Sequence, residues 1–135
     1  MIGIVVASHG RLGEEVLVTA RDIVGELPAM TSCSVAPGVS AEALRDTIRQ
    51  AVARVDSGEG VVVLADLVGG SPCTQSLTLC QQARLEVVTG FNLPMVLKAN
   101  SLRKSCASLA DLARELAASG QRAIACVTEP LRRAS

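Results

Sequence analysis

The chain has 135 residues, of which 49% are hydrophobic and 19% are charged, a composition typical of one globular domain and not of a disordered segment. Thirteen basic residues balance thirteen acidic ones, and Phe91 is the only aromatic residue. The chain therefore lacks both the excess positive charge and the aromatic platforms on which nucleic acids are usually held.

The cysteines indicate a reducing compartment. They are five in number and scattered, no CxxC pair occurs, and the single histidine cannot complete a zinc set. The sequence shows no signal-peptide pattern and no apolar run of about 18 residues or more. We therefore expect a cytoplasmic protein with reduced, mostly buried thiols, no metal and no cofactor.

The first half of the chain alternates between strand and helix patterns. Residues 2–7 are continuously apolar, which predicts a strand buried on both faces. A second, shorter strand is expected at residues 32–36, and Ser40 is a candidate N-cap for the helix after it. The apolar stripe of the first helix comprises Val16, Leu17, Ala20, Ile23, Val24 and Leu27, and that of the second Leu44, Ile48, Val52 and Val55.

The alternation continues through the middle of the chain. Residues 61–65 predict another buried strand, after which Ser71-Pro72 is typical of an N-cap followed by proline at the first helical position. A short strand is expected at residues 85–88, and Asn92 is a candidate cap for the helix that follows.

The C-terminal part predicts one more helix and one more strand. The helix is expected over residues 108–119, with Gly120 as its stop. A weaker apolar run at residues 123–127 predicts the last strand, and about 129–135 are expected to form a frayed, flexible tail. Strands that alternate with helices favour a single α/β domain, with an open, mostly parallel sheet flanked by helices.

Polar residues cluster where the predicted strands end. Open parallel sheets bind ligands beyond the carboxyl ends of their strands. His9 follows the first strand, Asp66 ends the otherwise apolar run VVVLAD, and Gly69-Gly70-Ser71 comes directly before a helix. We therefore expect these residues to meet at one edge of the sheet.

Each of these residue types has a use in phosphoryl chemistry. A carboxylate beside an imidazole fixes the tautomer, so that one ring nitrogen stays available as a nucleophile. Glycines before a helix let backbone N–H groups approach an anion at the positive end of the helix. The set predicts a histidine that accepts and returns a phosphoryl group, with protein groups that orient it and stabilise charge.

Three motifs carry a resemblance to a known family over essentially the whole chain. IGIVVASHG, VLADLVGGSP and VVTGFNLPMVL resemble, in order and spacing, the mannose-family IIA component of the bacterial phosphoenolpyruvate-dependent sugar phosphotransferase system. The resemblance implies that His9 takes a phosphoryl group from the phosphocarrier HPr and passes it to a IIB component. It further implies that Asp66 orients His9, and that Gly70 and Ser71 lie in the loop around the phosphoryl oxygens. The residue pattern adds Gly69 to this phosphate-binding turn.

The same resemblance has implications for assembly. It implies a homodimer in which the last strand, here residues 123–127, is exchanged and lies antiparallel at the edge of the partner's sheet. It implies contact with a membrane only through the transporter complex. The chain departs from the family after GGSP, where Cys73-Thr74-Gln75 replaces a segment that often contains asparagine. Arg11 is expected to be a surface residue, and Cys73 a small apolar helix residue.

Other functions fit less well or remain open. Ser8 and His9 are adjacent on a strand and point to opposite faces, which argues against a hydrolase triad with Asp66. A response-regulator receiver needs acidic residues where Ser8-His9-Gly10 stands. The phosphocarrier subunit of a dihydroxyacetone kinase remains an alternative, because SHGRLGEEV resembles its opening motif. A regulatory phosphoprotein that signals by binding another protein is a further alternative.

Overall fold

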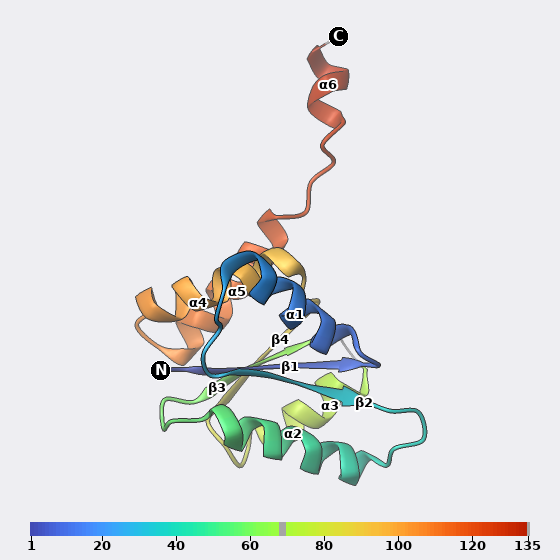
Figure 1. Ribbon diagram of the computed structural model, residues 1–135, viewed down its shortest axis with the longest axis vertical. Coiled ribbons are helices and arrows are strands. Elements are labelled where there is room, and N and C mark those ends of the chain that lie inside the picture. Colours follow the sequence, from blue (N-terminus) through green and yellow to red (C-terminus); the bar gives the residue numbers. More distant parts are fainter. Residues whose placement is uncertain (68–69, 135) are drawn as a thin grey trace.

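The computed structural model describes residues 1–67 and 70–134, and shows a sheet covered by helices on both faces (Figure 1). The elements in chain order are β1 (Gly3–His9), α1 (Leu12–Val24), β2 (Met30–Val35), α2 (Ala41–Val55), β3 (Val61–Ala65), α3 (Ser71–Leu79), β4 (Leu85–Thr89), α4 (Leu93–Ser105), α5 (Leu109–Arg122) and α6 (Glu129–Ala134).

In the described part of the chain, four strands lie in the order β2-β1-β3-β4, and every neighbouring pair is parallel. β1 and β3 occupy the centre, where side chains are buried on both faces, and this explains their continuously apolar sequences. The predicted α/β class and open parallel sheet are confirmed. The carboxyl ends of the strands share one edge, because His9 pairs with Val35 and Ala65 pairs with Thr89.

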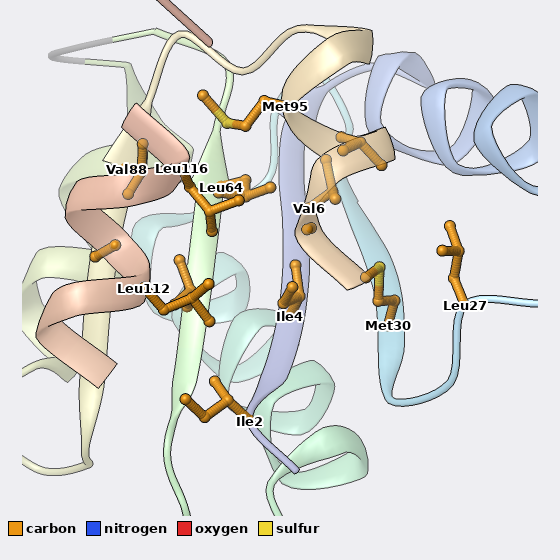
Figure 2. Packing of buried hydrophobic residues seen from close by; sticks show 14 of the residues in the cluster. Ile2, Ile4, Val6, Leu27, Met30, Leu64, Val88, Met95, Leu112 and Leu116 are labelled. Atoms are coloured by element: carbon orange, nitrogen blue, oxygen red, sulfur yellow. The ribbon is translucent and has the colours of Figure 1, made fainter. Parts of the chain in front are cut away.

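The two faces of the sheet carry separate cores. Ile4 and Val6 point to the face covered by α1, α4 and α5, where they pack with Leu64, Leu112 and other apolar residues (Figure 2). Val5 and Ala7 point to the opposite face, which α2 and α3 cover. The alternation of side chains along β1 therefore places His9 on the side of α2 and α3.

Most predicted helix starts match the structure. The Oγ of Ser40 accepts a hydrogen bond from the backbone N of Ala43 at 3.1 Å, and the Oδ1 of Asn92 accepts one from Met95 at 3.0 Å. α3 begins one residue earlier than expected, since Gly70 is its N-cap and Ser71 its first residue. The predicted stripe of α2 is buried throughout.

Two helix predictions are wrong in detail. Gly120 does not end α5 but lies inside it, where an added Cβ would be 2.7 Å from Cε of Met95. The missing side chain thus allows α5 to approach α4. Ile23 and Val24 were expected to face inward, yet they are 58% and 48% exposed. α1 ends at Val24, and these two side chains of its last turn are exposed, whereas Leu17 and Ala20 are buried.

The predicted strand at residues 123–127 is also wrong for the single chain. After α5 these residues form turns and coil, and no strand pairs with them among the described residues. The segment leaves the body of the molecule and leads to α6 at the far end (Figure 1). A strand exists only where its backbone groups pair with a neighbour, and this segment has no neighbouring strand in one copy. Within residues 1–67 and 70–134, no antiparallel edge strand therefore completes the sheet.

None of the described helices combines the length and the apolar character that crossing a bilayer requires.

Candidate functional site

His9 ends β1 at the carboxyl edge of the sheet, and its side chain is 50% exposed. Ser8, directly before it, is fully buried on the opposite face, and its Oγ accepts a hydrogen bond from the backbone N of Gly13 at 2.8 Å. This contact joins the end of β1 to the first turn of α1 and fixes the turn that carries His9. The opposite directions of Ser8 and His9 match the expectation that argued against a hydrolase triad.

Asp66 lies beside His9, at the end of the neighbouring strand β3. Its Oδ2 is 2.7 Å from Nδ1 of the His9 ring and accepts a hydrogen bond from the His9 backbone N at 2.9 Å. Its Oδ1 accepts a hydrogen bond from the backbone N of Leu67 at 3.0 Å. Only 7% of the Asp66 side chain is exposed. Both carboxylate oxygens are therefore held, and the ring is held at Nδ1.

The environment of Asp66 favours its charged form. Burial by itself raises the pKa of a carboxyl group, but the hydrogen bonds from the His9 backbone and ring, the charge of the ring and the Leu67 N–H act in the opposite direction. The net result is a pKa below the ordinary value of 3.8. Asp66 is therefore an anion at neutral pH, and a proton on Nδ1 gives the hydrogen bond that this anion accepts.

Gly70 forms the wall of the site next to the imidazole. A Cβ at this position would lie 2.9 Å from Cε1 of His9 and 3.2 Å from Cδ1 of Leu67. The backbone of Gly70 has φ −75° and ψ 162°, which any residue can adopt. The position thus requires glycine because of the close approach to the ring, and not because of backbone strain.

The N-terminus of α3 lies directly after Gly70, next to the His9 ring. No side chain caps the helix, so its first N–H groups remain available for an anion in the positive field of the helix end. Ser71 is exposed at the first position, and Pro72 has no N–H to contribute. Gly69, which the sequence also assigned to this loop, lies outside the described residues.

Two other residues near the site are placed as expected. Arg11 is an exposed residue at the N-cap of α1, and its guanidinium pairs with Glu14 at 3.5 Å and Glu15 at 3.1 Å in the first turn of that helix. Cys73 is 5% exposed on the inner side of α3. Neither side chain is therefore aimed at the imidazole as a partner of His9.

The sequence analysis did not identify the contacts between the end of β1 and the start of α1 that hold His9 in place. Gly13 allows α1 to approach β1, since an added Cβ would lie 3.0 Å from the carbonyl O of Val6. A serine at the end of a buried strand, followed by glycine early in the next helix, is the signal that could have revealed this contact. In the described parts of the chain, no three His, Cys, Asp or Glu side chains gather as metal ligands would.

A family model described as "PTS system fructose IIA component", of the mannose-type IIA family, matches residues 3–117. The chain belongs to this family. It is a IIA component of the mannose/fructose/sorbose type, and as such a member of a family of phosphoryl carriers in the phosphotransferase system.

Relatives of known name support this assignment. The chain is 34% identical over 98 residues to the mannose-specific EIIAB component of Escherichia coli K12. The matched region covers 72% of this chain but only 30% of that protein. It is 26% identical over 132 residues to the fructose-specific EIIA component of Bacillus subtilis, covering 97% and 90% of the two chains. The IIA chain thus spans less than a third of the E. coli protein's length.

Solved structures show the same fold. The mannose/sorbose-specific IIA subunit of Enterococcus faecalis has a TM-score of 0.79 and 30% identity, covering 93% of each chain. A PTS IIA protein associated with the fucose utilization operon of Streptococcus pneumoniae has a TM-score of 0.79 and 32% identity, covering 96% of this chain and 95% of its own.

Proposed function

We propose that this IIA component carries a phosphoryl group on Nε2 of His9. The contact between Nδ1 of His9 and Oδ2 of Asp66, at 2.7 Å, is the observation that carries the proposal. This contact keeps the proton on Nδ1, so the lone pair of Nε2 stays free to act as the nucleophile. Since the ring is half exposed, a second protein can bring its own phosphohistidine against Nε2.

The transfer step uses this geometry without any general base. Nε2 of His9 attacks the phosphorus of the donor, and a new N–P bond forms while the N–P bond of the donor breaks. The donor imidazole keeps the electron pair of the broken bond, and the proton on Nδ1 of His9 stays where it is. The carboxylate of Asp66 balances the positive charge that develops on the His9 ring. Transfer to an acceptor reverses these events.

Gly70 and Ser71, together with Gly69, are proposed to receive the phosphoryl oxygens. Support comes from the uncapped N-terminus of α3 next to His9, because backbone N–H groups at a helix start bind phosphate and stabilise charge in the transition state. Positioning and electrostatics are the main contributions that a protein makes to phosphoryl transfer.

We propose HPr as the donor and a IIB component as the acceptor, which would link the chain to sugar uptake and phosphorylation. The family membership supports this assignment, and the similar E. coli protein is named as a mannose-specific EIIAB component. The relatives are named for mannose, fructose, sorbose or a fucose operon, so a single sugar does not follow from them.

We further propose that residues 123–127 are exchanged between two copies and lie antiparallel along β4 of the partner. β4 ends the sheet, and a groove of about 450 Å³ runs between it and α5. Ile124 and Val127 are each 77% exposed on the segment that leaves the body. Pairing across two copies would satisfy the edge of β4 and cover these apolar side chains.

The phosphoryl relay tests the proposed function. We expect the purified protein, given phosphoenolpyruvate, enzyme I and HPr, to gain one phosphoryl group per chain, measured by intact mass spectrometry. The modification should be acid-labile, as an N–P bond is. It should be absent from His9→Ala under the same conditions. Labelling of that variant at the level of the wild type would contradict the proposal.

A further inference from the structure

The side chain of Arg45 connects two helices on the same face of the sheet. It lies in the second turn of α2, and its Nε donates a hydrogen bond to Oε1 of Gln75 on α3 at 3.1 Å. Among the described residues, this is the one side-chain hydrogen bond that joins α2 to α3, and Arg45 makes no ion pair there. Within the described residues, no carboxylate therefore forms an ion pair with the Arg45 guanidinium.

Two arginines that pair with carboxylates of one helix offer a contrast. Arg11, the N-cap residue of α1, binds Glu14 and Glu15, and Arg49, one turn after Arg45 on α2, binds Asp46. Helical pairs of this kind neutralise their charges and leave little field beyond the helix. Arg45 instead extends to a neighbouring helix whose sequence, SPCTQSLTL, contains no charged residue.

The position of Gln75 places this charge close to the proposed phosphate cradle. Ser71 and Gln75 are four residues apart on α3, so they lie one above the other on the same face of the helix. Side chains on a helix lean toward its N-terminus. α2 and α3 both begin at the carboxyl edge of the sheet, so Arg45 leans toward the edge that carries His9.

His9 faces the same side of the sheet. Its side chain follows the direction of Val5 and Ala7 in β1, whose face is covered by α2 and α3. The imidazole therefore lies at the carboxyl edge of the sheet, on the face that α2 and α3 cover. The same region contains Arg45, Gln75 and Ser71. Arg11, the cation nearest to His9 in sequence, is already paired with two glutamates.

We propose that Arg45, held by Gln75, supplies the positive charge of the phosphate cradle at the start of α3. It acts as a positioning and electrostatic residue: it fixes the first turns of α3 against α2, and it adds a full charge to the partial charge of the helix end. The inference rests on the proposed phosphorylation of His9. It assigns a purpose to Gln75, which lies in the second turn of α3.

A double-mutant cycle tests the proposal with the full chain. Arg45→Met, Gln75→Leu and the double variant are compared in the rate of phosphoryl transfer from phospho-HPr, with Arg49→Met as the matched control. We expect each single variant to lower kcat roughly tenfold, with the KM for phospho-HPr unchanged, because the cradle acts on the transferring group and not on docking. The double variant should be no slower than Arg45→Met, and Arg49→Met should match the wild type.

Arg45→Lys separates charge from a purely structural contact, because it keeps the charge but not the guanidinium geometry; we expect it to retain most of the wild-type rate. Loss as large as in Arg45→Met would overturn the electrostatic role. Unchanged kcat in Arg45→Met, a change confined to KM, or additive effects of the two single variants would overturn the proposal. Failure of the proposed function can be distinguished from failure of the Arg45 proposal, because the wild-type protein itself would then accept no phosphoryl group.

Discussion

Oδ2 of Asp66 accepts two hydrogen bonds from the same residue: one from the ring Nδ1 of His9 at 2.7 Å, and one from the His9 backbone N at 2.9 Å. The oxygen thus fixes both the end of β1 and the orientation of the imidazole. Because β1 and β3 are adjacent parallel strands, the sheet itself brings together two residues that are 57 positions apart in sequence.

We expect Asp66→Asn to fold but to transfer the phosphoryl group roughly a hundredfold more slowly. An amide has only one oxygen, so its NH2 group must face either His9 or the Leu67 N–H, and one backbone donor loses its acceptor. With the NH2 group toward His9, the ring proton would shift to Nε2 and block the nucleophile. Single-turnover transfer from phospho-HPr measures the rate, and circular dichroism checks the fold. Transfer at the wild-type rate would show that Asp66 only supports the chain locally.

The stability that Asp66 contributes should depend on pH in a defined direction. Its pKa in the folded protein is lowered, so the contribution is fully present above the pKa of the unfolded chain and is lost as the pH falls through the folded pKa. Urea unfolding of the wild type and Asp66→Asn should therefore differ most at neutral pH, and the difference should disappear in acid. A difference that grew on acidification would contradict the assigned direction.

Gly70→Ala should impair transfer while preserving stability. The new Cβ would lie 2.9 Å from Cε1 of His9, so the ring or the loop must shift, and a misplacement of about 1 Å in a reacting group can cost roughly a hundredfold in rate. The backbone angles at Gly70 are open to alanine. Thr74→Ala, on the exposed face of α3, is the control. Equal transfer by Gly70→Ala and the wild type would exclude this close approach as a requirement.

Arg103 should be a major determinant of stability. It is 6% exposed, and its guanidinium donates to the carbonyl oxygens of Ile2 (3.2 Å) and Pro28, and to Oδ1 of Asn100. Burial lowers its pKa, and no carboxylate among the described residues pairs with it. Arg103→Met should cost about 3 kcal/mol by leaving buried carbonyls without donors.

Urea unfolding measures this loss, and Lys104→Met, at the adjacent exposed position, should change stability by less than about 0.5 kcal/mol. A small effect of both variants would mean that water or backbone rearrangement replaces the bonds of Arg103. The two adjacent basic residues thus differ in environment, since Arg103 is buried and Lys104 is exposed.

Val127→Asp should convert the proposed dimer to a folded monomer. A charge on the exchanged segment would be buried in the groove along β4 of the partner, at a cost that exceeds the gain from pairing. Light scattering measures the molar mass, and a chain truncated before Arg122 should behave in the same way or lose solubility. Two results would contradict the exchange: a wild-type monomer, or a dimer unaffected by Val127→Asp.

Much of the fold could be predicted because local signals and tertiary structure agree. The stripe Leu44, Ile48, Val52 and Val55 is buried as expected, and the caps Ser40 and Asn92 make the hydrogen bonds that their positions predict. The meeting of His9 and Asp66 followed from one rule, that parallel strands end at a common edge.

The remaining features depend on contacts that the sequence does not specify. Glycine usually ends a helix, but Gly120 continues α5 because Met95 of α4 packs against it. The apolar residues of 123–127 indicate burial without indicating which chain provides the covering surface. The hydrogen bond between Arg45 and Gln75 joins two residues that are 30 positions apart in sequence and lie on different helices. The periodicity within either helix does not predict it.

The most direct test of the account is to locate the phosphoryl group after the relay. The protein is phosphorylated through enzyme I and HPr, with nitrogen-15-labelled histidine as its single imidazole, and nuclear magnetic resonance identifies the nitrogen bonded to phosphorus. We expect phosphorus on Nε2 of His9 and the proton on Nδ1. A phosphoryl group on Nδ1, or on any residue other than His9, would contradict the account.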